Sequence, residues 1–147
     1  MRSKLIHDAN GERTFAVILE AGDEIMASLN IFATENNLEA ATFKAIGALS
    51  EATLAYFDWD KGEYLPIPVV EQVEVASLTG DVASGPDGKP AVHVHAVLGK
   101  RDGGAVAGHL KSGLVRPTLE IILTEAPGHL RKRFDPKTGI ALIDPSL

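Results

Sequence analysis

Cysteine is absent from the 147-residue sequence, so a disulfide, a thiolate zinc site, an iron–sulfur cluster and a cysteine nucleophile are all excluded. No apolar run approaches the roughly 20 residues that a membrane-spanning helix requires. The polar segment 7–10 (His-Asp-Ala-Asn) interrupts the N-terminal region before a signal-peptide core could form. We therefore expect a cytoplasmic protein.

Positive charge is in the minority, because 14 Lys and Arg face 20 Asp and Glu and give a net charge of −6. Binding to phosphate backbones depends on clustered Lys and Arg side chains, so this composition argues against broad nucleic-acid binding. The 45% apolar and 23% charged content is ordinary for a folded protein. The length fits one domain spanning residues 1–147.

One segment has the periodicity of a long helix. Apolar side chains recur at helical spacing at Ile25, Leu29, Phe32 and Ala33. We expect Asp23 to be the N-cap and Glu24 to lie in the first turn, where a negative charge suits the helix dipole. The helix should end near Asn36-Asn37, since asparagine tolerates left-handed backbone geometry.

The other apolar segments are short and favour strands. We expect strands over 14–19, 40–49, 51–59, 64–69, 71–78, 91–98 and 118–123, and two short apolar segments around a turn at 135–139. Pro66 and Pro68 restrict their strand to a sheet edge. One helix with about seven strands that do not alternate with helices predicts an α+β domain, mostly antiparallel. No phosphate-binding glycine motif is present.

Three of the five histidines lie close together in the sequence, at His93, His95 and His109. His93 and His95 occupy alternate positions of the segment 91–98, so a strand there places both on one face. Their Cα atoms would lie about 6.5–7 Å apart, which lets two imidazoles reach one ion. The other face of this strand is apolar throughout and should pack against the core.

His109 is placed opposite His95 if residues 100–104 form a five-residue hairpin loop. Gly99 then pairs with Ala105, the paired numbers sum to 204, and 204 − 95 gives 109. Opposite Cβ atoms lie about 4.5–5.5 Å apart, so three imidazoles would face one point. A bulge in this glycine-containing region would break the register.

Three neutral imidazoles suit Zn²⁺ and are acceptable ligands for Ni²⁺, Cu²⁺ or Fe²⁺. Three protein ligands leave a fourth position open, as in catalytic zinc sites. The alternative is that two of the histidines form ordinary hydrogen bonds within a sheet and the third lies elsewhere. His7 and His129 are expected on the surface, and the basic run 131–133 is expected to be solvated.

Two carboxylates interrupt apolar strands, Glu120 and Glu74. Such a group must face water or have a partner, and Arg116 is a candidate partner of Glu120. The functional alternative is that one of them accepts a hydrogen bond from a ligand imidazole or acts as a base. Arg116 or Lys111 would then hold an anionic substrate.

Several short motifs follow one another in a characteristic order. They are Gly47-Ala48-Leu49, the segment 73–80 (Val-Glu-Val-Ala-Ser-Leu-Thr-Gly), Val92-His93-Val94-His95, Gly108-His109-Leu110 and Thr118-x-Glu120-Ile121. In this order they resemble the PPC (plant and prokaryote conserved) domain family, in its prokaryotic stand-alone branch. The resemblance covers about residues 15–143.

The resemblance implies a compact α+β fold of about seven mostly antiparallel strands with one main helix, assembled as a homotrimer. It also implies that His93, His95 and His109 are metal-site residues, often with zinc and near a subunit boundary. Members of this branch often have Gly-Gly-His-Leu where this chain has Ala107-Gly108-His109-Leu110. The difference leaves the histidine in place.

The family is often labelled DNA-binding because its plant members carry AT-hooks. The Arg-Gly-Arg-Pro core that an AT-hook inserts into the minor groove does not occur in this sequence. A trimer would carry 3 × −6 = −18, a charge that disfavours DNA.

Three functions are compatible with these observations. The first is a metal-binding trimeric module, and the second is a metal-dependent enzyme acting on a small polar substrate, with Glu120 or Glu74 as its base. The third is a DNA-binding or regulatory protein. We favour the metal-binding module, for which the sequence assigns no substrate.

Overall fold

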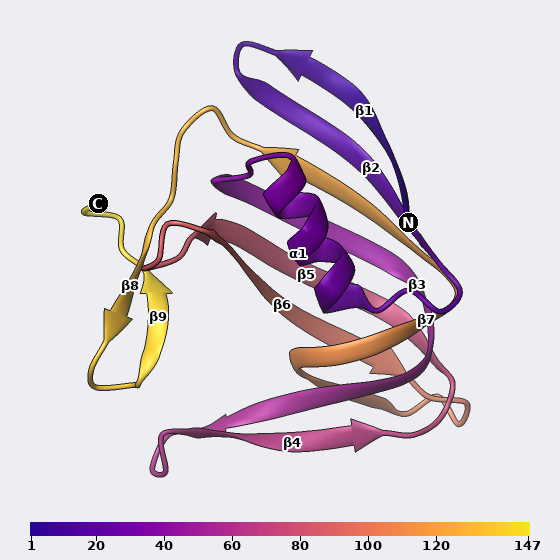
Figure 1. Cartoon of the computed structure of the whole chain (residues 1–147). Coiled ribbons are helices and arrows are strands. Elements are labelled where there is room, and N and C mark those ends of the chain that lie inside the picture. Colours follow the sequence, from indigo (N-terminus) through magenta and orange to yellow (C-terminus); the bar gives the residue numbers. More distant parts are fainter.

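The computed structural model describes all of residues 1–147 and shows a single domain with one helix and nine strands (Figure 1). The helix is α1 (Ile25–Glu35). The strands are β1 (Arg2–Ala9), β2 (Glu12–Glu20), β3 (Ala40–Asp58), β4 (Glu63–Val69), β5 (Val73–Ser84), β6 (Pro90–Gly99), β7 (Ala105–Glu125), β8 (Lys132–Asp135) and β9 (Ile140–Ile143). Strands β1 to β7 form one sheet and β8–β9 form a separate hairpin. The predicted α+β class, with a mostly antiparallel sheet of seven strands, is confirmed.

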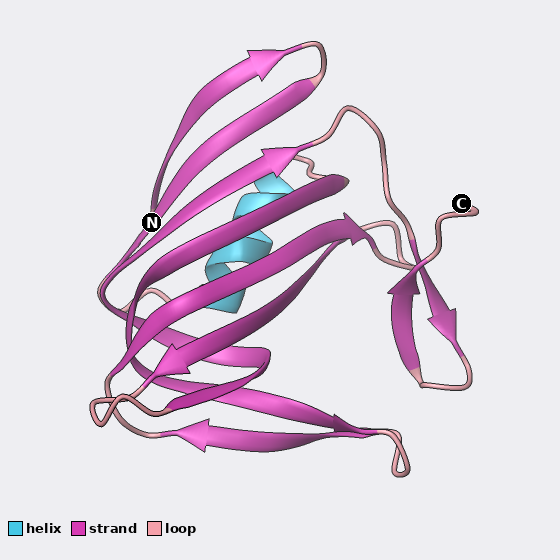
Figure 2. Ribbon diagram, turned by 180° about the vertical axis from the view of Figure 1, so that it is seen from behind, coloured by secondary structure: helices cyan, strands magenta, loops and turns pink.

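The main sheet curls because two of its strands are long and pair with several neighbours. Its order is β1-β2-β7-β6-β5-β3-β4, and β7 pairs in addition with β3. Strands β3, β5, β6 and β7 therefore close into a ring of antiparallel pairs, seen from behind in Figure 2. Register shifts along the β3–β7 ladder, such as the one between Gly47 and Leu49, bend both strands. Two predicted strands, 40–49 and 51–59, are thus one bent strand.

Helix α1 lies against the inner face of the curled sheet, next to β6 and β7 (Figure 1). Ile25, Leu29 and Phe32 are buried there, as their spacing predicts. The ring of Phe32 meets that of Phe15 edge-on, with centroids 5.3 Å apart. The helix is too short and too polar to cross a membrane.

The N-terminus of the helix differs from the prediction by one residue. Glu24, rather than Asp23, is the N-cap, and its carboxylate accepts a hydrogen bond from the Ala27 N–H at 2.7 Å. Asp23 instead accepts from the Glu20 N–H at 2.9 Å and lies 2.8 Å from the N-terminal ammonium. Both contacts lower the pKa of Asp23 below its usual value. The other oxygen of Glu24 accepts from the Gly113 N–H at 3.0 Å, which ties the helix to β7.

Strand β1 has no counterpart among the predicted strands, because all eight of its residues are exposed and no apolar alternation marks it. Its backbone pairing with β2 holds it in place. Strand β4 lies at the edge of the sheet, as Pro66 and Pro68 predict.

The β8–β9 hairpin stands away from the main sheet and is fastened to it near β5 and β6 (Figure 1). The Ser84 N–H donates to the Leu130 carbonyl at 2.9 Å. Lys132 is buried, and its Nζ donates to the Ala91 carbonyl at 3.2 Å. The expectation that the whole run 131–133 is solvated is therefore wrong for Lys132, although Arg131 and Arg133 are exposed.

Candidate metal centre

The hairpin of β6 and β7 brings two histidines directly opposite each other. His95 pairs with His109, and Gly99 pairs with Ala105 across the 100–104 loop. The ladder between these pairs has no bulge, so the register predicted from loop length is confirmed. His93 lies two residues before His95 and shares its face, because the intervening Val94 points into the core.

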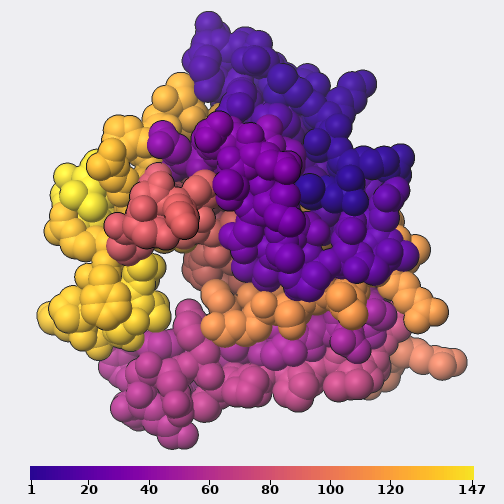
Figure 3. Space-filling model, viewed as in Figure 1, coloured from indigo at the N-terminus to yellow at the C-terminus, as the bar shows by residue number.

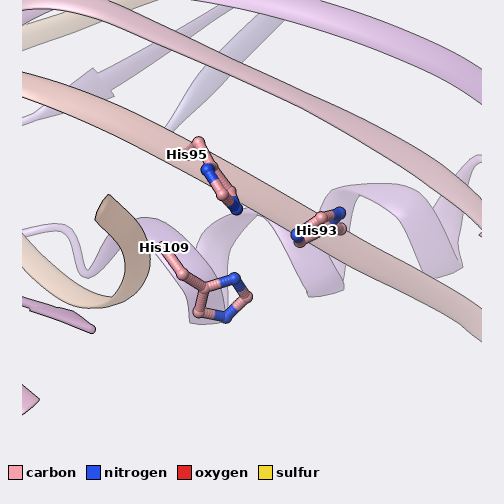
Figure 4. A group of neighbouring side chains, drawn as sticks. All are labelled: His93, His95 and His109. Atoms are coloured by element: carbon pink, nitrogen blue, oxygen red, sulfur yellow. The ribbon is translucent and has the colours of Figure 1, made fainter. Parts of the chain in front are cut away.

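The three imidazoles form one compact group on the outer face of the sheet. One nitrogen from each ring lies within 4.8 Å of the others, and Figure 4 shows the rings converging. Ring centroids are 5.0 Å apart for His93 and His95, 5.2 Å for His93 and His109, and 5.5 Å for His95 and His109. Tetrahedral zinc with bonds of about 2.0–2.1 Å separates its donors by about 3.3 Å, so the rings would move closer together on binding. The group could hold a metal ion.

One ring nitrogen of the group lacks a hydrogen-bond partner. The Nδ1 atom of His109 is buried and has no hydrogen-bond partner. Leaving a buried polar atom unpaired costs about 1–3 kcal/mol, and such atoms in native proteins are rare. Coordination of a cation by this nitrogen would remove the cost, so the donor set fits a metal.

The surroundings of the group favour uncharged imidazole rings, the form that binds metals. Burial, together with the neighbouring His93 and Lys111, lowers the pKa of His109 to about 4. His95 is more exposed, yet partial desolvation and the proximity of His93 also lower its pKa. Both rings are therefore neutral near pH 7, with a lone pair available for a cation.

Asp81 on β5 orients the third imidazole. It lies directly opposite His93 in the β5–β6 ladder, and its Oδ2 is 3.3 Å from the His93 Nδ1. A proton on Nδ1 leaves the lone pair of Nε2 available to a metal. Burial would raise the pKa of Asp81, but the contacts with His93 and Lys132 outweigh it and lower the pKa. Lys132 contributes an Nζ at 3.1 Å from the Asp81 Oδ1.

An aromatic ring and a lysine flank the group on the side of β4 and β7. The Tyr64 ring packs against His109 with centroids 4.7 Å apart and planes tilted by 32°. The Lys111 Nζ lies 4.2 Å from the centroid of Tyr64, a cation–π contact. Lys111 follows His109 by two residues in β7 and so projects from the same face.

A cavity of about 360 Å³ opens beside His93 and His109. The β8–β9 hairpin forms its far wall, and Asp81 is the one acidic residue in its lining. The complete lining is Tyr64, Asp81, Ala91, Val92, His93, His109, Lys132, Ile140, Ala141, Leu142 and Ile143.

The other predicted site residues lie apart from the three histidines. Glu120 pairs with Ile18 and Ile46 on the exposed face of the sheet, and no salt bridge joins it to Arg116. Glu74 pairs with Gly99, four residues from His95 and thus about 13 Å along β6. None of Glu120, Glu74 and Arg116 lines the cavity, so the structure gives them no place at the site. His7 and His129 are exposed, as expected.

Asp81, Tyr64 and Lys132 belong to the site but were not identified from the sequence. The length of the preceding turn predicts the position of Asp81, just as the length of the 100–104 loop predicts that of His109. If Ala83 pairs with Ala91 across the 84–90 turn, the numbers sum to 174, and 174 − 93 gives 81. Tyr64 and Lys132 approach from the sheet edge and the C-terminal hairpin, and no local pattern indicates this.

Solved structures of other proteins share this fold, and three of them illustrate the similarity. A metal-containing protein from Archaeoglobus fulgidus is 34% identical, with 88% of this chain and 91% of that chain covered and a TM-score of 0.82. A plant- and prokaryote-conserved (PPC) protein from Pyrococcus horikoshii is 32% identical, with coverages of 90% and 91% and a TM-score of 0.83. A protein from Bacteroides thetaiotaomicron, described as a candidate DNA-binding protein, is 25% identical, with coverages of 96% and 96% and a TM-score of 0.85.

No curated protein matches the chain at a significant level. A family model does match it, in agreement with the solved structures. Residues 6–127 match the Plants and Prokaryotes Conserved (PCC) domain, and this match includes all three histidines. This protein belongs to the Plants and Prokaryotes Conserved domain family.

Proposed function

We propose that this protein binds one divalent transition-metal ion per chain, with zinc favoured, through His93, His95 and His109. The observation that carries the proposal is the buried, unpaired Nδ1 of His109 within a group of three convergent ring nitrogens. Neutral imidazoles are good ligands for zinc and acceptable ones for nickel, copper or ferrous iron. The description of the Archaeoglobus fulgidus relative as metal-containing supports the proposal.

Each surrounding residue has a separate task in this proposal. Asp81 holds the His93 ring by its Nδ1, at 3.3 Å. Tyr64 packs against the His109 ring and limits its rotation. Lys132 balances the charge of Asp81 and fastens the C-terminal hairpin beside the site. A metal ion held by three neutral imidazoles acts as a Lewis acid.

A binding role is favoured over hydrolytic or lyase chemistry. Acid–base catalysis needs a titratable group within hydrogen-bond reach of the reacting atoms. Asp81 is the one carboxylate lining the cavity, and it is already engaged in ion pairs with His93, through Oδ2, and with Lys132, through Oδ1, although Oδ1 accepts no hydrogen bond. Glu120 and Glu74, the bases considered from the sequence, lie elsewhere.

We also propose that the chain assembles as a homotrimer, as the family resemblance implies. An apolar groove of about 700 Å³ runs over the outer face of the sheet between β2, β3, β5 and β7. Its wall includes Ile46 and Ile122, which are 63% and 42% exposed. Contact with another copy would remove these side chains from water. Light scattering coupled to size exclusion tests this, with three chains expected for the wild type and a smaller species for Ile46→Glu.

Calorimetric titration of zinc into metal-free protein tests the metal proposal. We expect one ion per chain for the wild type and for the matched surface variants His7→Ala and His129→Ala. His95→Ala and His109→Ala should each lose stoichiometric binding. Full occupancy in both of these variants, with folding verified by circular dichroism, would refute the proposal.

A further inference from the structure

The cavity beside the histidines is bounded by the C-terminal hairpin. Figure 3 shows a hollow between the yellow hairpin and the magenta β3–β4 region. Its volume of about 360 Å³ lies within the range of about 300–1,000 Å³ that small-molecule sites occupy. Ile140, Leu142 and Ile143 line it from the hairpin, and Val92 lines it from β6. A predominantly apolar wall therefore ends at two of the three imidazoles.

The charges around this cavity do not balance once a metal is bound. Three neutral imidazoles leave the double positive charge of the ion uncompensated. Asp81 is already matched by Lys132, whose Nζ lies 3.1 Å from it. Lys111, over the ring of Tyr64, adds another positive charge. The site is thus a local positive centre on a chain whose net charge is −6.

An anionic ligand would neutralise this centre. The lining contains no arginine, the side chain that favours bidentate binding of phosphate. It offers a positive end and an apolar wall. A carboxylate with a short hydrocarbon body complements both parts.

We propose that the cavity between the histidine group and the β8–β9 hairpin binds a small aliphatic carboxylate, whose charged end is held by the metal and attracted by the nearby charge of Lys111, and whose hydrocarbon end lies against Leu142 and Ile143. This inference rests on the proposed metal site. Lys111 is not a metal ligand and does not line the cavity; it lies over the ring of Tyr64, which does, and acts through its charge. Leu142 is 45% exposed, so the bound hydrocarbon would cover it from water.

The test is calorimetric titration of zinc-loaded protein, whose metal content is measured first. Butyrate is the probe, and butyramide has the same shape without the charge. We expect butyrate to bind at least about ten-fold more tightly than butyramide, because charged contacts contribute about 1.5–3 kcal/mol. Inorganic phosphate should bind more weakly than butyrate.

Two variants and one matched control locate the ligand. Lys111→Gln should weaken butyrate about two- to five-fold, the range for partly exposed charge pairs, while metal content stays full. Lys100→Gln, which removes a lysine paired with Glu71 at the other end of β6, should change nothing. Leu142→Ala should weaken butyrate about three- to four-fold and leave acetate unchanged, since a buried methylene contributes about 0.8 kcal/mol.

The outcomes separate the two proposals. Full metal content with equal or absent binding of butyrate and butyramide overturns the carboxylate site and leaves the metal site standing. Tighter binding of phosphate than of butyrate overturns the assigned ligand class. A wild-type protein that takes up no zinc overturns the metal site and, with it, this inference.

Discussion

Asp81 and His93 face each other across the β5–β6 ladder, and the carboxylate Oδ2 lies 3.3 Å from the Nδ1 of the imidazole. A hydrogen bond of this kind fixes the tautomer and orientation of a ligand imidazole. We predict that Asp81→Asn lowers zinc affinity about 10- to 100-fold without abolishing binding. Competition with a zinc chelator measures the change.

A matched control separates this effect from a loss of folding. Asp87 lies in the turn after β5, and its side chain accepts a hydrogen bond from the Lys89 N–H alone. Asp87→Asn should keep wild-type zinc affinity. Equal zinc affinities for wild type, Asp81→Asn and Asp87→Asn would show that Asp81 does not contribute to metal binding.

Gly108 permits the close approach of β7 to β3 beside His109. A Cβ at this position would lie 2.7 Å from the Ala55 carbonyl oxygen, so one of the two strands would have to shift. We predict that Gly108→Ala destabilises the metal-free protein by about 1–3 kcal/mol and lowers zinc affinity. Urea denaturation and chelator competition measure the two effects.

Gly128 is the appropriate comparison, because a Cβ there meets no atom within 4 Å and its backbone is not left-handed. Gly128→Ala should leave both stability and zinc affinity within error of the wild type. A Gly108→Ala protein as stable as Gly128→Ala would contradict the close packing at this point.

Acidification should weaken the metal-free fold through His109. Its pKa of about 4 in the folded chain lies below the usual value of about 6.5, so the unfolded state binds more protons between these pH values. The contribution of His109 to the free energy of unfolding is therefore fully present above pH 6.5 and is lost as the pH decreases toward 4. His109→Gln should show a shallower fall, measured by urea denaturation at several pH values, and the exposed His7→Gln should follow the wild type. A wild-type slope in His109→Gln would count against the lowered pKa.

Duplex DNA should not bind this chain at physiological ionic strength, although one relative is described as a candidate DNA-binding protein. The net charge of −6 per chain repels a polyanion, and Lys132, in the basic run 131–133, is buried against Asp81. Fluorescence anisotropy with a labelled duplex measures this. Binding that weakens steeply with salt would contradict the prediction.

Much of the site was accessible from the sequence because it is built on hairpins of fixed loop length. The 100–104 loop sets the register that places His109 against His95, and alternation along β6 sets the face of His93. The same reasoning would have found Asp81 across the neighbouring turn. The pairing of two strands joined by a short loop depends on the loop length, so the register can be predicted by counting residues.

The parts that the sequence did not predict depend on long-range packing or lack a pattern. Lys132 is buried by a hairpin whose docking involves contacts 41 and 51 positions away along the chain, at Ala91 and Asp81. Strand β1 is wholly exposed and therefore has no apolar periodicity. Glu120 stands out in an apolar strand, yet in the single chain it is exposed on the outer face, beside Ile46 and Ile122 of the apolar groove. The sequence of one strand does not show which of its two faces other parts of the protein cover.

The most direct test of the account is elemental analysis of protein purified without an affinity tag, for the wild type and for His93→Ala, His95→Ala and His109→Ala. We predict about one transition-metal ion per wild-type chain and its loss from each variant, while His129→Ala retains it. A wild-type protein without metal, even after incubation with zinc, would contradict the account and make the three histidines ordinary residues of the sheet.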